Sequence, residues 1–180
     1  MKKSFLLLSA FFVLSISCKN NTVQKISSID EKMGFKDLKL ETHVNQYESL
    51  QTVLLHEYPD VHIKVFKVQN EKYLKIGTIN LSEVEITTID DTISKITISK
   101  KDALIEGDDL IDVLNEQYGK ATQMPDKSGY YWTGNNCVIN YNISDGDIIG
   151  MAEVSFSSVR LSEKFLSYSK QQKILNSSEL

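Results

Sequence analysis

Three histidines, His43, His56 and His62, are the side chains of this sequence best suited to bind a metal or to move protons. His56 and Glu57 begin like the helical zinc motif, in which the second histidine follows four residues after the first. Here the next histidine follows six residues later, and Pro59 would break the helix between them. We therefore expect histidines at the surface or at helix ends, and no metal site.

Acidic residues cluster at three places without forming the pattern of a calcium loop. Such a loop needs oxygen ligands at alternate positions and a bidentate acid at its end. Turns and helix caps explain the clusters more simply. The sequence also lacks a glycine-rich phosphate loop and a Gly-x-Ser-x-Gly motif, so we predict no catalytic residues and no cofactor. A hydrolase built from scattered residues remains an alternative. The clusters are Asp90-Asp91, Asp108-Asp109-Asp112 and Asp145-Gly146-Asp147.

The two cysteines, Cys18 and Cys137, are too few for a disulfide scaffold and are expected to have separate roles. Cys18 ends an N-terminal segment in which Lys2 and Lys3 precede an apolar stretch over residues 5–14. That stretch is too short to span a bilayer, which takes about 20 residues, and it is typical of a signal peptide.

This start resembles the signal of a bacterial lipoprotein of the Bacteroidetes type. The resemblance implies that residues 1–17 are removed and that Cys18 carries the lipid that anchors the chain to a membrane. A secreted protein with an incidental cysteine at the cleavage site is the alternative. Residues 18–33 are polar and predict a flexible tether. In lipoproteins of this type, an acidic run after the cysteine resembles the chains that are exported to the cell surface. Here Lys19 follows Cys18 and no such run is present, so we expect the periplasmic face of the envelope.

The charge of the chain argues against nucleic acid as a partner. Lys+Arg 20 and Asp+Glu 24 give a net charge of −4 and a pI near 5.4, without a basic stripe. Removing residues 1–17 takes away two lysines and no acid, which leaves −6. A basic protein surface is therefore the more plausible partner.

Residues 103–160 predict one helix followed by three strands. Leu110, Leu114 and Tyr118 lie at helical spacing, with Asp108 or Asp109 as the N-cap and Gly119 as the C-cap. The residues after Gly119 change to a period of two, which indicates strands. The three expected strands cover residues 130–132, 137–143 and 152–156.

Residues 34–102 predict the same order after a leading strand at 35–40. Apolar residues at helical spacing predict a helix over 44–58 that ends at Pro59. Strands are expected near 73–76, 84–87 and 96–98, with a turn at Asp90-Asp91. Two αβββ repeats would form antiparallel sheet with helices on one face, an α+β fold. Residues 161–180 predict a C-terminal helix and tail.

Tandem helix-plus-meander units on an exported chain resemble the β-lactamase inhibitor protein fold and the small lipoproteins of outer-membrane assembly. The resemblance implies protein binding rather than catalysis. We expect a lipid-anchored, non-enzymatic binding or assembly-accessory module. The alternative is an inhibitor or immunity-type protein that neutralises a secreted hydrolase or toxin.

Tyr130, Tyr131 and Trp132 are the candidate partner-binding residues, because aromatic side chains beside a loop often anchor interfaces. The competing interpretation is that alternate rings of this run face the core. Cys137 lies on the apolar face of its expected strand and is predicted to be an inert core thiol.

Overall fold

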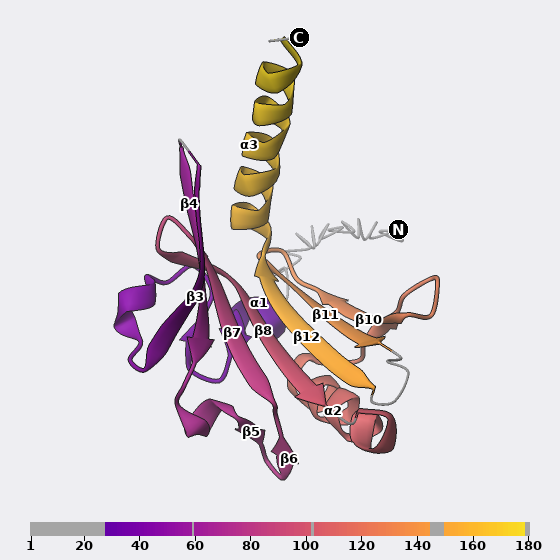
Figure 1. Ribbon diagram of the computed structural model, residues 1–180. Coiled ribbons are helices and arrows are strands. Elements are labelled where there is room, and N and C mark those ends of the chain that lie inside the picture. The colour runs from indigo at the N-terminus through magenta and orange to yellow at the C-terminus, as the bar shows by residue number, and fades with distance from the viewer. Residues whose placement is uncertain (1–27, 59, 102, 145–149, 179–180) are drawn as a thin grey trace, which may run out of the picture.

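The computed structural model describes residues 28–58, 60–101, 103–144 and 150–178. They form an α+β fold around one eight-stranded antiparallel sheet of order β3-β4-β7-β8-β12-β11-β10-β9 (Figure 1). The strands are β3 (Leu50–Tyr58), β4 (Val61–Val68), β7 (Glu83–Ile89), β8 (Thr92–Lys101), β9 (Thr122–Gln123), β10 (Gly129–Thr133), β11 (Cys137–Ser144) and β12 (Met151–Ser158).

Helices, 3-10 turns and two small hairpins surround this sheet. The helices are α1 (Ser28–Lys32), α2 (Ala103–Tyr118) and α3 (Val159–Ser178). Two 3-10 turns, η1 (Val44–Gln46) and η2 (Glu71–Tyr73), connect strands. Two small hairpins pair β1 (Gly34–Phe35) with β2 (Leu38–Lys39) and β5 (Lys75–Ile76) with β6 (Ile79–Asn80). The expected leading strand at 35–40 is therefore a hairpin of two short strands, and the strand expected near 73–76 is present only as the two-residue β5, which follows the turn η2.

The prediction for the second half is confirmed in its helix and its three long strands. Gly119 ends α2 with a φ of 87°, and its amide donates to the carbonyl of Asn115 at 2.9 Å. The predicted cap at Asp108 or Asp109 is wrong, because α2 begins at Ala103 and both residues lie inside it. The turn expected at Asp145-Gly146-Asp147 lies outside the described residues.

The helix predicted over residues 44–58 is wrong. Val44–Gln46 form only the turn η1, and Leu50–Tyr58 form the strand β3. β3 pairs with β4 as a hairpin, from Leu50 opposite Val68 to Tyr58 opposite Val61, with Val53 left out of the register. The apolar residues of this segment are spaced as in a helix, but their backbone groups form hydrogen bonds with β4 instead. Long-range strand pairing thus overrides the local pattern.

The two halves of the sheet are each a four-stranded meander. β3, β4, β7 and β8 run from one edge to the centre, and β9 to β12 run from the other edge to meet them at the β8–β12 pair. The first meander is not preceded by the predicted helix, so two αβββ repeats are not confirmed.

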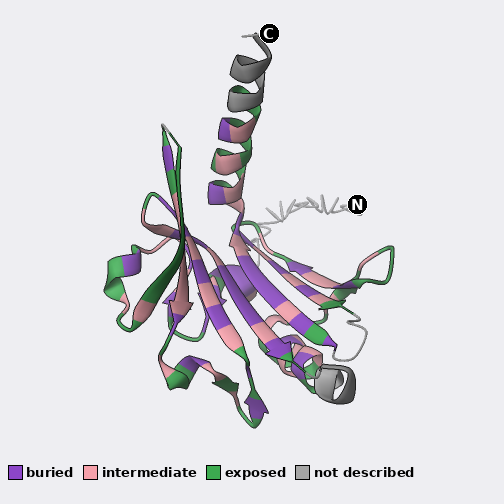
Figure 2. Ribbon diagram, viewed as in Figure 1, coloured by how far each residue is buried: buried purple, intermediate pink, exposed green. Residues whose placement is uncertain are grey.

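The main core lies between the sheet and the layer formed by α1, α2 and the β1–β2 hairpin. Buried residues gather along β7, β8 and β12, as Figure 2 shows. Phe156 of β12 is at the centre, with its ring centroid 6.1 Å from Phe35 and 5.7 Å from Tyr118. Residues 28–32 thus belong to the folded part as α1, with Ile29 buried. The prediction of a flexible tether over residues 18–33 is therefore wrong for residues 28–32.

The predicted C-terminal helix is confirmed as α3, which packs on the opposite face of the sheet. Its Leu161 and Tyr168 form a small apolar cluster with Val61 of β4 and Ile89 of β7. The remainder of α3 extends past the end of the sheet, on the same side as the tip of the β3–β4 hairpin (Figure 1).

Candidate protein-binding edge

The aromatic run at 130–132 does not form a joint exposed patch. Trp132 is only 3% exposed, and its Nε1 donates a 2.6 Å hydrogen bond to the carbonyl of Gly119. Tyr130 is half-buried, with its ring centroid 6.2 Å from that of Tyr141. Tyr131 points to the other face of the sheet and is half-buried there. Trp132 is therefore a core residue, which corrects its candidacy as a partner-binding residue.

Cys137 is fully buried in the core, and burial raises the pKa of its thiol to about 12. The thiolate is then a negligible fraction at neutral pH, which suits an inert packing residue. Cys18, the predicted lipidation site, lies outside the described residues.

The histidines do not assemble a metal site within the described part of the chain, where no three His, Cys, Asp or Glu side chains are placed to hold an ion. His56 and His62 are on β3 and β4, with His56 opposite Ile63 and His62 opposite Glu57. His62 instead contacts Asp90.

Three of the cavities in the described part of the chain border the helices. The smallest, of about 260 Å³, lies beside α2, and its only charged lining residue is Lys36. The remaining two also do not bring reactive groups together. One, of about 320 Å³, lies between α3 and the sheet, and its only charged lining residue is Lys95. The other, of about 630 Å³, lies between α2 and β6, and its charged lining residues are Asp109 and Asp112. Neither lining combines an acid with a base, so neither resembles a site for proton transfer.

The most unusual surface is the strand β3, which forms one edge of the sheet. Large apolar side chains of this strand are exposed: Val53 by 47%, Leu54 by 44%, Leu55 by 50% and Tyr58 by 40%. An edge strand also directs the N–H and C=O groups of alternate residues away from its one neighbour. We name this strand, Leu50–Tyr58, the β3 edge.

The β3 edge lacks most devices that natural proteins use to protect an exposed strand. Its nine residues contain one formally charged side chain, Glu57, and no proline or lysine. Lysines, prolines and short length are the usual protection against strand addition. One device is present, a bulge between Thr52 and Leu54. The opposite edge of the sheet differs, because β9 has only two residues, Thr122 and Gln123.

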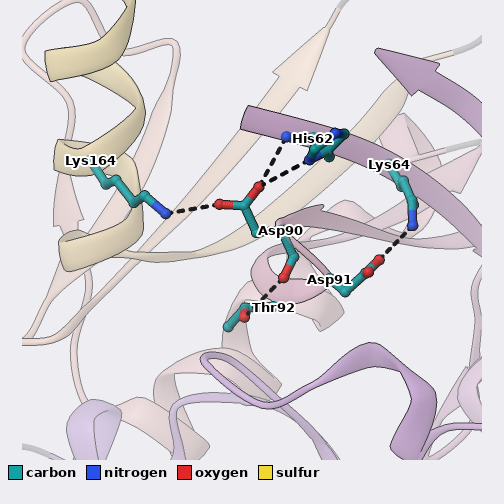
Figure 3. A network of polar contacts seen from close by, with 6 residues as sticks. All are labelled: His62, Lys64, Asp90, Asp91, Thr92 and Lys164. Carbon is teal, nitrogen blue, oxygen red and sulfur yellow. Dashed lines mark hydrogen bonds and ion pairs between the residues drawn. The ribbon is translucent and has the colours of Figure 1, made fainter. Parts of the chain in front are cut away.

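A polar network holds the β3–β4 hairpin to the rest of the fold (Figure 3). The backbone amide of His62 donates to Oδ1 of Asp90 at 3.0 Å, and Nζ of Lys164 donates to Oδ2 at 2.9 Å. Asp90 thus links β4, the β7–β8 turn and α3. The hydrogen bond from the His62 amide, followed by that from Lys164, lowers the pKa of the Asp90 carboxyl below its usual range.

Further contacts support the hairpin on both sides of this network. Lys64 donates from Nζ to Oδ1 of Asp91 at 2.7 Å. Asp90 and Asp91 both have positive φ values, 50° and 58°, as expected for the tight turn predicted at this pair. The ring of Tyr58 meets that of Tyr168 of α3 edge to face, with centroids 5.9 Å apart. The hairpin is therefore a fixed part of the structure.

Sequence reasoning missed the β3 edge because it assigned these residues to a helix. The run Val53-Leu54-Leu55 was the available signal, since three consecutive apolar residues on an edge strand must expose some of them.

Comparison with family models, with curated proteins and with solved structures gave no match to this chain. Within its described residues, the chain has no helix that is both long enough and apolar enough to cross a membrane.

Proposed function

We propose that this chain is a lipid-anchored, non-enzymatic protein-binding module of the bacterial envelope, and that the β3 edge receives an extended strand of its protein partner. The observation that carries the proposal is the exposure of Val53, Leu54 and Leu55 on a nine-residue edge strand. Strand addition uses the outward backbone groups for affinity and the neighbouring side chains for specificity.

The energetics favour an added strand over a purely side-chain contact. Each new backbone hydrogen bond contributes about 0.5–1.5 kcal/mol, and burying apolar surface contributes roughly 25 cal/mol per Å². The contacts of Asp90 and Tyr168 hold the hairpin in place before binding, so little ordering of this chain opposes association.

Affinity capture of the tagged full chain from solubilised envelopes tests this binding role. We expect a partner to be recovered with the wild type and with Thr122→Lys, which alters the opposite edge, and to be lost with Leu55→Lys. Both lysines stand at exposed strand positions, so they match in chemistry and differ in edge. Equal recovery from all three proteins would contradict the proposal.

The anchor is a separate part of the proposal, supported by the resemblance of residues 1–18 to a lipoprotein signal. We propose that Cys18 carries the lipid and that the domain faces the periplasm. Changing Cys18 to Ser should release the protein from the membrane pellet. If the variant still pellets with membranes, the lipid does not hold it there.

As part of the same proposal, the two halves are related units, as in the β-lactamase inhibitor protein fold and the small assembly lipoproteins that the chain resembles. The mirrored strand order of the two meanders supports this relationship. The shared unit would then be four strands rather than αβββ.

A further inference from the structure

We infer that the cavity between α3 and the sheet binds a free medium-chain fatty acid, with the hydrocarbon chain against the apolar lining and the carboxylate at Lys95. None of the residues that line this cavity belongs to the β3 edge. The inference therefore goes beyond the proposed function and does not depend on it.

The walls of the cavity favour a hydrocarbon. They come from the first turns of α3 and from the strands β4, β7, β8 and β12. Large apolar side chains line both the helix side and the sheet side, and each methylene that they withdraw from water favours binding. These side chains are Ile63, Ile89, Phe165 and Leu166.

The volume of the cavity sets the length of the chain that fits. An apolar cavity of about 150 Å³ holds one benzene molecule, and the present cavity of about 320 Å³ is about twice as large. It therefore accommodates roughly twelve carbon atoms. Leu166 of the lining is 57% exposed, so the cavity opens to solvent at α3. A flexible chain can follow this space and cover Leu166 at its opening.

The charge of the lining favours a ligand with one negative charge. Lys95 is the only charged lining residue, and it has no ion pair within the described part of the chain. It lies opposite Thr87 of β7 and Ser157 of β12, two uncharged residues that also line the cavity. The closest acidic position along β7 is Glu85, which lies opposite Thr97 and outside the lining. A carboxylate beside Lys95 would gain a charge-assisted hydrogen bond.

The contacts of α3 form this cavity before a ligand arrives. Leu161 packs with Val61 and Ile89, and Nζ of Lys164 donates to Oδ2 of Asp90 at 2.9 Å. These contacts fix the start of the helix against the sheet, while the rest of α3 extends past the end of the sheet (Figure 1). A preformed site binds with a smaller cost of ordering the protein.

Calorimetric titration of the full Cys18→Ser chain in buffer without detergent tests the inference, because this chain has no lipid at residue 18. We expect saturable binding of one decanoate per chain. Lys95→Met should lower the affinity for decanoate on the order of tenfold and leave that for decanol unchanged, since methionine removes only the charge. Lys101→Met, at an exposed position of β8 outside the lining, should leave both affinities unchanged.

A second set of variants tests the place of binding. Ser162→Phe fills the cavity with a ring and should abolish binding of both ligands. Ser167→Phe places the same ring at an exposed position of α3 and should leave binding unchanged. Leu55→Lys, on the β3 edge, should also leave binding unchanged. The native emission of Trp132 verifies that each variant is folded.

The outcomes that overturn the inference are distinct. One is the absence of saturable decanoate binding to the folded chain. Another is an affinity for decanoate that Lys95→Met and Lys101→Met change equally, because the carboxylate would then not lie at Lys95. Binding that survives Ser162→Phe, or that is lost in Leu55→Lys, would place the ligand outside the cavity. Tighter binding of the compact acid 2-naphthoate than of decanoate would refute a straight hydrocarbon chain as the occupant.

Discussion

The carboxylate of Asp30 accepts hydrogen bonds from the backbone amides of Asn135 at 2.7 Å and Asn136 at 2.8 Å. Asp30 is in α1, and the two asparagines form the β10–β11 turn, more than 100 residues later in the chain. Gly134 completes this close approach, because a Cβ there would lie 2.3 Å from Oδ1 of Asp30. One side chain thus fixes the start of the folded domain to the second meander.

We expect Asp30→Ala to lower the free energy of unfolding by about 1–3 kcal/mol, because two amides lose an acceptor in a partly buried site. Glu31→Ala is the control, since Glu31 is exposed in the same helix. Urea unfolding followed by circular dichroism measures both. Equal free energies for the two variants would contradict the anchoring role of Asp30.

The contacts of Asp90 that hold the β3–β4 hairpin are expected to weaken in acid. Its folded-state pKa is lower than its ordinary value of 3.8, so the ionised form stabilises the fold above that pH. This contribution is lost as the pH falls through the folded-state pKa. Because the side chain is 38% exposed, solvent screening limits the contribution to about 1 kcal/mol or less.

Comparing wild type with Asp90→Asn by urea unfolding at pH 7 and at pH 2.5 tests this account. The variant should be less stable at pH 7, and the difference should shrink at pH 2.5. Asp112→Asn serves as a control at an exposed position of α2, outside the hairpin. A difference that stays constant between the two pH values would contradict the role assigned to the Asp90 carboxylate.

Trp132 is the only tryptophan of the chain, so tryptophan fluorescence reports directly on the burial of this ring. We expect a blue-shifted emission in the native protein and strong protection from iodide quenching, because the ring lies in the core and its Nε1 is bonded to Gly119. Unfolding should shift the emission to the red. Quenching of native Trp132 as strong as that of unfolded protein would restore it as a surface residue.

Cys137 should resist thiol reagents in the native state, since its thiol is buried and its pKa is raised to about 12. We expect little maleimide labelling at pH 7.5 in the Cys18→Ser chain and complete labelling in urea. The measurement is the mass of the intact protein over time. Rapid native labelling would place Cys137 at the surface.

Sequence pattern alone predicted the second half of the sheet well, and the reason is local. From Ile139 to Ser144 the residues alternate between apolar and polar, which is the pattern of a half-buried strand. The turn at Asp90-Asp91 was equally readable, because two aspartates tolerate the positive φ values that a tight hairpin needs.

The first half shows where local pattern fails. In β3, Leu50, Leu54 and Tyr58 are four residues apart, a spacing that suits one face of a helix. Four is also a multiple of two, so the same spacing suits one face of a regular strand. The choice is made by pairing with β4, and the exposed position of β3 is made by the order of all eight strands. Neither the pairing with β4 nor the strand order can be read from the periodicity of one segment, so the β3 edge becomes visible only in the structure.

Hydrogen exchange of the β3 edge tests the central claim most directly, because it reads the backbone groups that an added strand would occupy. Peptides covering Leu50–Tyr58 are compared between isolated envelopes and the dilute, detergent-purified full chain, with peptides covering Thr122–Gln123 as the internal control. We predict slower exchange of the β3 peptides in envelopes and equal exchange of the β9 peptides. Equal exchange of the β3 peptides in both preparations would contradict the claim.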